Sequence, residues 1–321
     1  MDALGGLLDG ARARGAFVLR LSLDPPWSML IRDDAPLTLI CMTDGSAVIV
    51  TDSGATYDLS PGDVAVARGV EHYRYAGHPD TDPQVVIHPG NRCTTVRGDD
   101  LRFEMSVGVR TWGNAAAGAH RSIICTYDGR SEVSARLLEA LPTVLVLRSG
   151  ELPTPLVDLL SAEAGREGPG QEAYLDRLLD LLLMDVLRTW FDRDQRAPTW
   201  WHAEHDPVVG PALRLLHNNP EHPWTVANLA TAVGNSRAVF ARRFTELVGE
   251  PPIAFLTSWR LALAADMLRD DGATLTAIAR RVGYGTPFAL SSAFKRAYGV
   301  SPTDYRRSSS RGNRTEHVAG V

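Results

Sequence analysis

Short apolar runs separated by turn-forming residues fill the first third of the chain. Five of these runs are rich in β-branched and aliphatic residues, and they predict strands over residues 17–23, 37–42, 47–51, 63–67 and 122–127. The sequences DPP, DGS, DSG, SPGD and HPGN lie between them and are typical of turns. Several short strands at this spacing favour a small antiparallel sandwich or barrel. We therefore predict a β-barrel over residues of about 15–130.

The pattern changes to helical spacing after residue 131. A helix is predicted over 152–162, and a second, long amphipathic helix over 174–191 because apolar residues recur there every three to four positions. The charged, proline-containing stretch 192–206 predicts a linker, helices dominate 207–307, and 308–321 is expected to be a flexible tail. The expected fold class is α+β. Residues 1–191 form a barrel followed by helices at about 131–191, and the C-terminal domain is all-α.

A repeat of about 50 residues stands out in the last third of the chain. The two copies are LATAVGNSRAVFARRFTELVGEPP at 229–252 and IARRVGYGTPFALSSAFKRAYGVSP at 278–302. In each copy a glycine, Gly234 or Gly283, is placed to end a first helix. Ser236 and Thr286 are suited to cap the helix that follows. Each copy is thus predicted to be a helix-turn-helix unit.

The second helix of each copy separates apolar from polar positions. One face is expected to be core and carries Phe240, Phe244 and Leu247 in the first copy and Leu290, Phe294 and Ala297 in the second. The opposite faces carry arginine, small and apolar side chains. A helix with such a face suits a DNA major groove, where arginine reads guanine and apolar groups contact the thymine methyl. Two copies in phase make this interpretation far more specific than one.

Charge is distributed unevenly along the chain. From residue 208 onward there are 14 Lys and Arg against 8 Asp and Glu, whereas the remainder has 19 against 30. A basic C-terminal part on an acidic remainder indicates a polyanionic partner for one domain only. Hydrophobic residues make up 44% and charged residues 22% of the chain, which is typical of folded globular domains.

The block 278–306 resembles the signature of the AraC/XylS family of transcription regulators. The matching positions are Ile278, Ala279, Val282, Gly283, Tyr284, Phe294, Lys295, Gly299, Pro302 and Arg306. The resemblance implies that a connecting helix over 252–269 holds both units so that they reach successive major grooves of double-stranded promoter DNA. It also implies homodimers, contact with RNA polymerase and control of transcription, with an activator expected and a repressor as the open alternative.

The resemblance further implies which side chains meet DNA. The expected contacts of the two units are Ser236, Arg237, Ala238, Ala241, Arg242, Thr286, Pro287, Phe288, Ala289 and Ser292. Lys295 and Arg296, with Arg280 and Arg281, are expected at phosphates, which position the protein without reading sequence. Because the second face is mostly apolar, the first unit is expected to carry more of the sequence discrimination.

The N-terminal part resembles a cupin-type sensor. LSPGDVAVARGVEHY at 59–73 is similar to the second half of a cupin motif and predicts that His72 points into the barrel. Cupin enzymes hold a metal through an HxH pair, an acid and a final histidine, and the HxH pair is missing. We therefore expect no metal, no cofactor and no enzymatic activity. A three-ligand set of His72, His88 and Cys93 is one alternative, and a cupin-type metalloenzyme with a helical appendage is another.

Cys93 follows the turn HPGN and lies beside Arg92 and Arg97, which would favour its thiolate. A similar arrangement occurs in family members that respond to reactive chlorine or electrophiles. Cys93, alone or with Cys41 or Cys125, is therefore a candidate oxidant or electrophile switch, and a small-molecule effector is the other candidate signal. In the competing interpretation all three cysteines are buried small hydrophobic residues.

The helix over 174–191 has a wide apolar face, which predicts a homodimer contact. The residues assigned to it are Leu175, Leu178, Leu179, Leu182 and Val186. Packing of this helix against its own barrel is the alternative. No apolar run reaches the roughly 20 residues of a membrane span, and the N-terminus lacks the basic-then-apolar order of a secretory signal. We expect a cytoplasmic protein that does not bind membranes. A helical module that binds acidic proteins is a third functional alternative.

Overall fold

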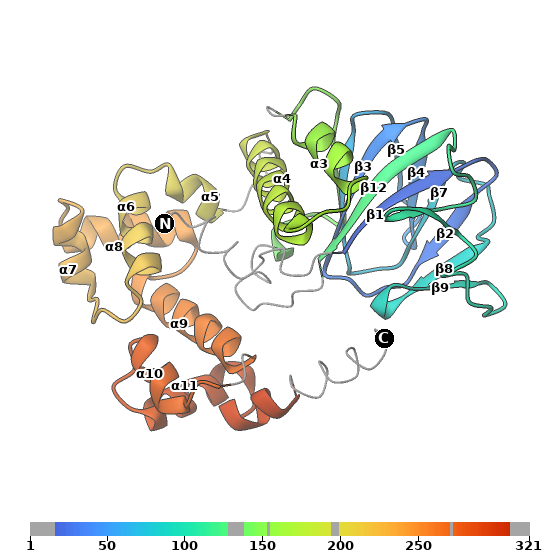
Figure 1. The fold of residues 1–321 in the computed structure, drawn as a ribbon. Helices are drawn as coiled ribbons and strands as arrows, with labels where there is room; N and C mark the ends of the chain where they lie inside the picture. Colours follow the sequence, from blue (N-terminus) through green and yellow to red (C-terminus); the bar gives the residue numbers. More distant parts are fainter. Residues whose placement is uncertain (1–16, 128–137, 153–154, 194–198, 270–271, 309–321) are drawn as a thin grey trace. The chain divides into compact units, whose positions relative to one another are not determined.

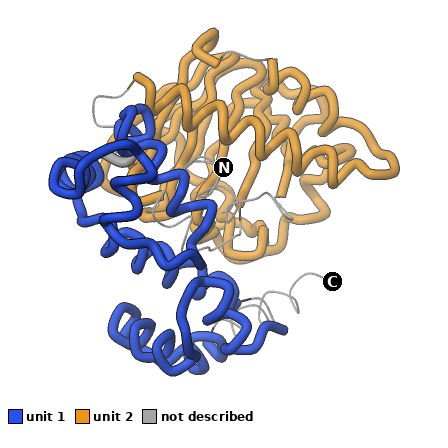
Figure 2. The backbone as a smooth tube through the Cα atoms, turned by 90° about the vertical axis from the view of Figure 1, so that its left-hand side faces the viewer, with its two compact units in different colours: residues 1–11, 131–137, 194–321 blue, residues 12–130, 138–193 orange. Residues whose placement is uncertain are grey.

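The strand-forming runs of the first third assemble into two sheets that enclose one core. In the computed structural model, residues 17–127, 138–152, 155–193, 199–269 and 272–308 are described. The chain divides into two compact units (Figure 2). The sheet domain comprises Arg12–Arg130 and Leu138–Arg193, and the helical domain contains Asp194–Val321. Among the described helices, none combines the length and apolarity needed to cross a bilayer.

Thirteen strands belong to the described part of the sheet domain. They are β1 (Phe17–Leu23), β2 (Ser28–Ile31), β3 (Leu37–Asp44), β4 (Ala47–Thr51), β5 (Thr56–Leu59), β6 (Val64–Arg68), β7 (Tyr73–Ala76), β8 (Val85–His88), β9 (Arg92–Thr95), β10 (Ser106–Gly108), β11 (Thr111–Trp112), β12 (His120–Tyr127) and β13 (Val144–Leu147). One sheet has the order β10-β11-β1-β12-β3-β6-β13, and the other has the order β5-β4-β7-β2-β8-β9. This architecture confirms the expected β-rich N-terminal domain.

Strand β3 shows why its sequence is an unbroken apolar run. Ile40 and Met42 are buried in the core between the two sheets. Leu39 and Cys41 alternate with them and are just as buried on the opposite face. On that side α3 (Leu156–Ala164) and α4 (Gln171–Arg193) lie against the sheet (Figure 1), and the hydroxyl of Tyr127 donates to the backbone oxygen of Leu179 over 3.1 Å. A strand that is covered on both faces is apolar throughout, whereas a half-exposed strand alternates between apolar and polar residues.

Two boundaries differ from the sequence-based expectation. Strand β13 lies within the region expected to be helical, where Leu145 and Val146 pair with Val66 and Ala65 of β6. This pairing spans about eighty residues, so local periodicity could not reveal it. The expected linker 192–206 contains helix α5 (Thr199–Glu204), whose Ala203 is fully buried in the first helical core. Residues 194–198 of the linker and 309–321 of the expected tail lie outside the described residues.

The helical domain is organised around one long helix. Its elements are α5, α6 (Val209–Asn218), α7 (Val226–Ala232), α8 (Arg237–Val248), α9 (Pro252–Arg269), α10 (Leu275–Arg281) and α11 (Pro287–Tyr298). Phe255 and Leu256 near the start of α9 pack into the core of α6, α7 and α8. Ala264 and Leu268 near its end pack into the core of α10 and α11. The connecting helix has the bounds that the sequence predicts, and it joins two separate cores.

Gly283 ends α10 at a place where no other residue fits. Its φ of +82° is in the left-handed region, and a Cβ there would lie 2.8 Å from the Cα of Glu221 and 2.7 Å from a guanidinium nitrogen of Arg260. Arg260 on α9 in turn donates to the backbone oxygens of Pro220 and His222 over 2.6 and 2.8 Å. The turn of the second repeat copy is thus packed against the loop that precedes α7.

Candidate nucleic-acid interface

Helices α7 and α8 form the first helix-turn-helix, and α10 and α11 form the second. The hydroxyl of Ser236 accepts from the amide of Val239 at the start of α8, and that of Thr286 accepts from the amide of Ala289 at the start of α11. Gly249 and Gly299 end these helices with φ of +89° and +75°. Ser236 and Thr286, the capping residues predicted for the starts of both second helices, are confirmed.

The core faces of α8 and α11 are the predicted ones, with one exception. Phe240 and Phe244 are completely buried, as are Leu290 and Phe294. Ala297, which was expected in the core, is exposed instead. The neighbouring Tyr298 takes the inner position because its ring stacks on Phe294 at 4.4 Å between centroids.

The outer face of α8 presents arginines to solvent. Arg237, Ala238 and Arg242 are exposed, and Ala241 is partly buried beside them. Arg242 has one ionic neighbour on its own helix, Glu246 at 3.8 Å, and both side chains are more than 60% exposed. Such an exposed ion pair contributes little to the free energy of folding. The guanidinium can therefore leave Glu246 for a ligand at little cost.

A further arginine of α8 has a structural role that sequence reasoning missed. Arg243 donates from Nε to both carboxylate oxygens of Asp206 over 3.1 and 2.9 Å, and from Nη2 over 2.6 Å. The same carboxylate accepts from the amides of Val208 and Val209 where α6 begins. Burial alone would raise the pKa of Asp206, but the hydrogen bonds from Arg243 and the amides outweigh it and lower the pKa.

Asp206 therefore anchors α8 to the start of α6. An aspartate shortly before a predicted helix is a recognisable capping signal. Its pairing with an arginine 37 positions later leaves no local trace in the sequence.

The outer face of α11 has a different chemistry. Phe288, Ala289 and Ser292 are exposed, whereas Pro287 is partly buried. Lys295 and Arg296 are exposed in the last turn of the helix. Arg280 and Arg281, at the end of α10, are exposed as well. The basic groups of the second helix-turn-helix thus flank a first turn of α11 that carries no charge.

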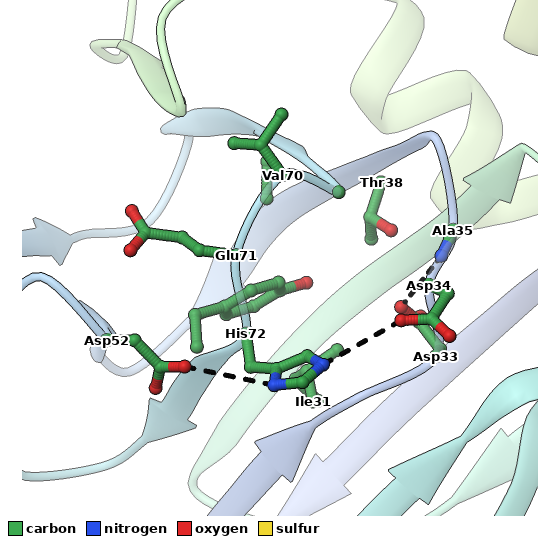
Figure 3. A pocket seen from close by; sticks show the side chains of 12 residues that line it. Ile31, Asp33, Asp34, Ala35, Thr38, Asp52, Val70, Glu71 and His72 are labelled. Carbon is green, nitrogen blue, oxygen red and sulfur yellow. Dashed lines mark hydrogen bonds and ion pairs between the residues drawn. The ribbon is translucent and has the colours of Figure 1, made fainter.

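His72 lies at the rim of the sheet domain, so the expectation that it points into the barrel is wrong. Its side chain is 45% exposed and lies between two carboxylates, with Nε2 3.7 Å from Asp34 and Nδ1 3.8 Å from Asp52 (Figure 3). The turn between β6 and β7 places it there, outside the core between the sheets. These residues line a pocket of about 300 Å³ together with Asp33 and Glu71. Burial raises the pKa of Asp33.

Cys93 lies in the hairpin of β8 and β9, at one edge of the six-stranded sheet. Its Sγ lies 3.6 Å from the backbone oxygen of Asn91, and His88 is hydrogen-bonded to Thr94 at 2.9 Å. Burial raises the pKa of Cys93 to about 11, and the positive charge of Arg102 offsets this increase only in part. The expectation that Arg92 and Arg97 favour the thiolate is wrong, because desolvation outweighs the attraction of nearby cations.

The other candidate partners of Cys93 are elsewhere. Cys41 and Cys125 are completely buried on the face of the seven-stranded sheet that α4 covers, and all three cysteines are free thiols. Within the described ranges, no three histidine, cysteine or acidic side chains converge as metal ligands. His72, His88 and Cys93 are therefore not a three-ligand set.

The five residues assigned to a dimer contact face their own domain. Leu175 and Leu178 are at most 5% exposed, and Leu179, Leu182 and Val186 are completely buried. That assignment is wrong, because the sheet and α3 already use this face of α4. The opposite side of α4 exposes Tyr174 by 47% and Leu181 by 51%.

Comparisons with known proteins agree with this two-part organisation. The family description "Cupin" matches residues 2–192, and "Helix-turn-helix domain" matches residues 229–308. An uncharacterized HTH-type transcriptional regulator of Haemophilus influenzae is 32% identical over 310 residues, which cover 96% of this chain and 99% of that protein.

Two further matches cover smaller parts. A putative AraC-like transcription regulator of Streptomyces antibioticus is 40% identical over 176 residues, and the chain spans 58% of that protein's length. A solved structure, the DNA-binding domain of AdpA, the global transcriptional factor, in complex with a target DNA, is 32% identical. It covers 32% of this chain and 92% of its own, with a TM-score of 0.30.

Proposed function

Because the chain belongs to the AraC family of DNA-binding transcription regulators and carries a cupin domain ahead of its helix-turn-helix pair, we propose that α8 and α11 enter two successive major grooves of a promoter site. The observation that carries this proposal is the pair of similarly capped helices with exposed outer faces, joined through α9. The relative that the chain matches over 99% of its length bears the name of an uncharacterized HTH-type transcriptional regulator. These relatives favour a regulator over the cupin metalloenzyme that the sequence alone leaves as an alternative.

The two helices are proposed to divide the work of recognition. Arg237 and Arg242 on α8 can each donate two hydrogen bonds to the O6 and N7 atoms of a guanine. Lys295 and Arg296 in the last turn of α11, with the arginines at the end of α10, are proposed to contact phosphates. Phosphate contacts give affinity and orientation, and base contacts give sequence preference.

Selection from a pool of random duplexes tests this proposal. We expect the full chain to enrich a site with two half-sites about 10 base pairs apart. Its affinity should fall steeply with salt, because each neutralised phosphate contributes a slope of about −0.9 in log K against log salt. Salt-dependent binding without any enriched sequence would contradict the proposal and favour a basic module that binds polyanions or acidic proteins.

We propose that the sheet domain senses a small molecule through the pocket around His72. Its described lining includes Asp33, Asp34, Asp52 and Glu71 and contains neither Lys nor Arg. Ile31 and Val70 add apolar surface to the same lining. A pocket with these properties suits a ligand with a positive charge and an apolar part.

A reactive signal at Cys93 is the less favoured alternative, and alkylation tests it. With a pKa raised to about 11, the thiolate fraction at pH 7 is roughly a hundredfold below that of an ordinary cysteine. We expect iodoacetamide to label Cys93 about a hundredfold more slowly in the folded protein than in the unfolded chain, with a rate that rises about tenfold for each pH unit. Mass spectrometry of the Cys93 peptide measures both rates. Equal rates would show an ordinary thiol and contradict the raised pKa, and a faster rate in the folded protein would show an activated thiolate and reinstate the oxidant switch.

We also propose that the regulator acts as a homodimer through the outer side of α4. Tyr174 and Leu181 lie two helical turns apart and are each about half exposed. A second copy covering them would place two DNA-binding domains on one promoter and raise the overall affinity through effective concentration.

A further inference from the structure

Phe288 is the most exposed large apolar side chain among the described residues of the helical domain. It is 80% exposed and occupies the second position of α11. A phenylalanine left in water gains none of the stabilisation that burial of its ring would provide. Its surroundings explain why it stays outside, and they indicate what would cover it.

The inner positions of α11 are already filled. Leu290 and Phe294 are completely buried with α9 and α10, and Tyr298 stacks on Phe294. Phe288 is two residues from Leu290 and four from Ser292, so it belongs to the outer row of the helix with the exposed Ser292. No rearrangement of α11 could bury Phe288 without exposing this core.

The first turn of α11 fixes the backbone from which Phe288 projects. The hydroxyl of Thr286 accepts from the amide of Ala289 over 3.1 Å, and Pro287 occupies the first helical position. A phenylalanine has only two side-chain torsions, so ordering it on a partner costs little entropy. The first turn of α11 thus presents an aromatic side chain from a well-defined backbone position.

The first turn of α11 lacks the groups that read guanine. Its exposed side chains are Phe288 and Ala289, and the charged residues begin a further two turns along, at Lys295. At the equivalent places α8 has Ala238 for Phe288 and Arg242 for Ser292. The apolar feature of a base edge in the major groove is the C5-methyl group of thymine.

We propose that Phe288 reads thymine in the second half-site by packing against its C5-methyl group. This inference rests on the proposed function, because it assigns a base to one of the two reading helices. It makes the recognised site chemically asymmetric. The half-site under α8 would be read through guanine, and the half-site under α11 through thymine.

Replacing thymine by deoxyuridine tests the proposal, since the exchange removes only the methyl group. The probe is the duplex selected by the full chain, with each thymine replaced in turn, and binding is measured by fluorescence anisotropy. We expect one or two replacements in the second half-site to weaken binding about threefold to fivefold, the value of one buried methyl group. Replacements in the first half-site should have smaller effects.

The Phe288→Ala variant completes the test. We expect it to bind the thymine duplex about tenfold or more weakly and to lose the discrimination between thymine and deoxyuridine. The matched control is Phe103→Ala, because Phe103 is a similarly exposed phenylalanine, 87%, in the sheet domain. It should retain both affinity and discrimination. Circular dichroism checks that Phe288→Ala keeps its fold, which an exposed position should allow.

The outcomes distinguish a failure of this inference from a failure of the proposed function. If the wild-type chain selects a two-part site but no deoxyuridine replacement matters, or if Phe288→Ala keeps the full discrimination, the thymine assignment is overturned and the DNA-binding proposal stands. If the wild-type chain selects no sequence, both fail. The assignment is supported if the wild-type chain and Phe103→Ala discriminate thymine from deoxyuridine and Phe288→Ala does not.

Discussion

Replacement of both Arg237 and Arg242 by alanine is expected to abolish sequence-specific DNA binding while the protein remains folded. Both side chains are exposed on α8, and a bidentate contact from arginine to guanine contributes about 1–3 kcal/mol to discrimination. If the two contacts are independent, the double variant loses about 2–6 kcal/mol. Anisotropy titrations with the selected duplex and with a scrambled duplex measure the specific and the non-specific affinity.

Two matched variants show that the effect comes from reading bases. Arg237→Lys with Arg242→Lys keeps both charges but lacks the planar fork of the guanidinium, so it should retain non-specific binding and lose the preference for the selected duplex. Arg166→Ala removes a 71% exposed arginine from the sheet domain and should leave both affinities unchanged. Full sequence preference in the double lysine variant would show that the planar fork of the guanidinium is not what reads the bases.

Phe244→Ala and Phe294→Ala are expected to destabilise one helix-turn-helix each. Both rings are completely buried, but Phe244 lies in the core of α6, α7 and α8, and Phe294 lies in the core of α10 and α11. Truncating a buried phenylalanine costs about 3–5 kcal/mol. We expect that the DNA affinity of Phe244→Ala no longer depends on the sequence of the first half-site. The affinity of Phe294→Ala should no longer depend on the sequence of the second half-site.

Chemical unfolding and half-site mutations in the duplex measure this separation. Phe288→Ala is the internal control, because the same substitution at an exposed position of α11 should change the free energy of unfolding by less than about 0.5 kcal/mol. A single cooperative loss of both half-sites in either core variant would show that the two cores are energetically one, contrary to their separate packing.

Local chemistry made the helical domain predictable from the sequence. Gly249 and Gly299 end α8 and α11 in left-handed conformations, and Ser236 and Thr286 cap their starts. These signals act within four residues, so a sequence displays them directly. The buried rings of α8 and α11 follow from helical periodicity in the same way, whereas Ala297 shows its limit, since the larger Tyr298 fills the inner position.

Features that depend on distant pairing were not predictable in this way. Strand β13 exists because it pairs with β6, and Arg243 is held by a carboxylate 37 residues earlier. The leucines of α4 were assigned to a dimer because an apolar stripe does not reveal which surface covers it. Cys93 was assigned a thiolate from its sequence neighbours, but burial decides its pKa. In each case the missing information is tertiary.

The central claim is that α8 and α11 occupy adjacent grooves on one face of a DNA duplex, at a spacing that α9 fixes. Inserting five base pairs between the two half-sites of the selected duplex turns one half-site to the opposite face without altering either sequence. The account predicts that affinity falls to that of a duplex with a single half-site. An unchanged affinity after this insertion would contradict it.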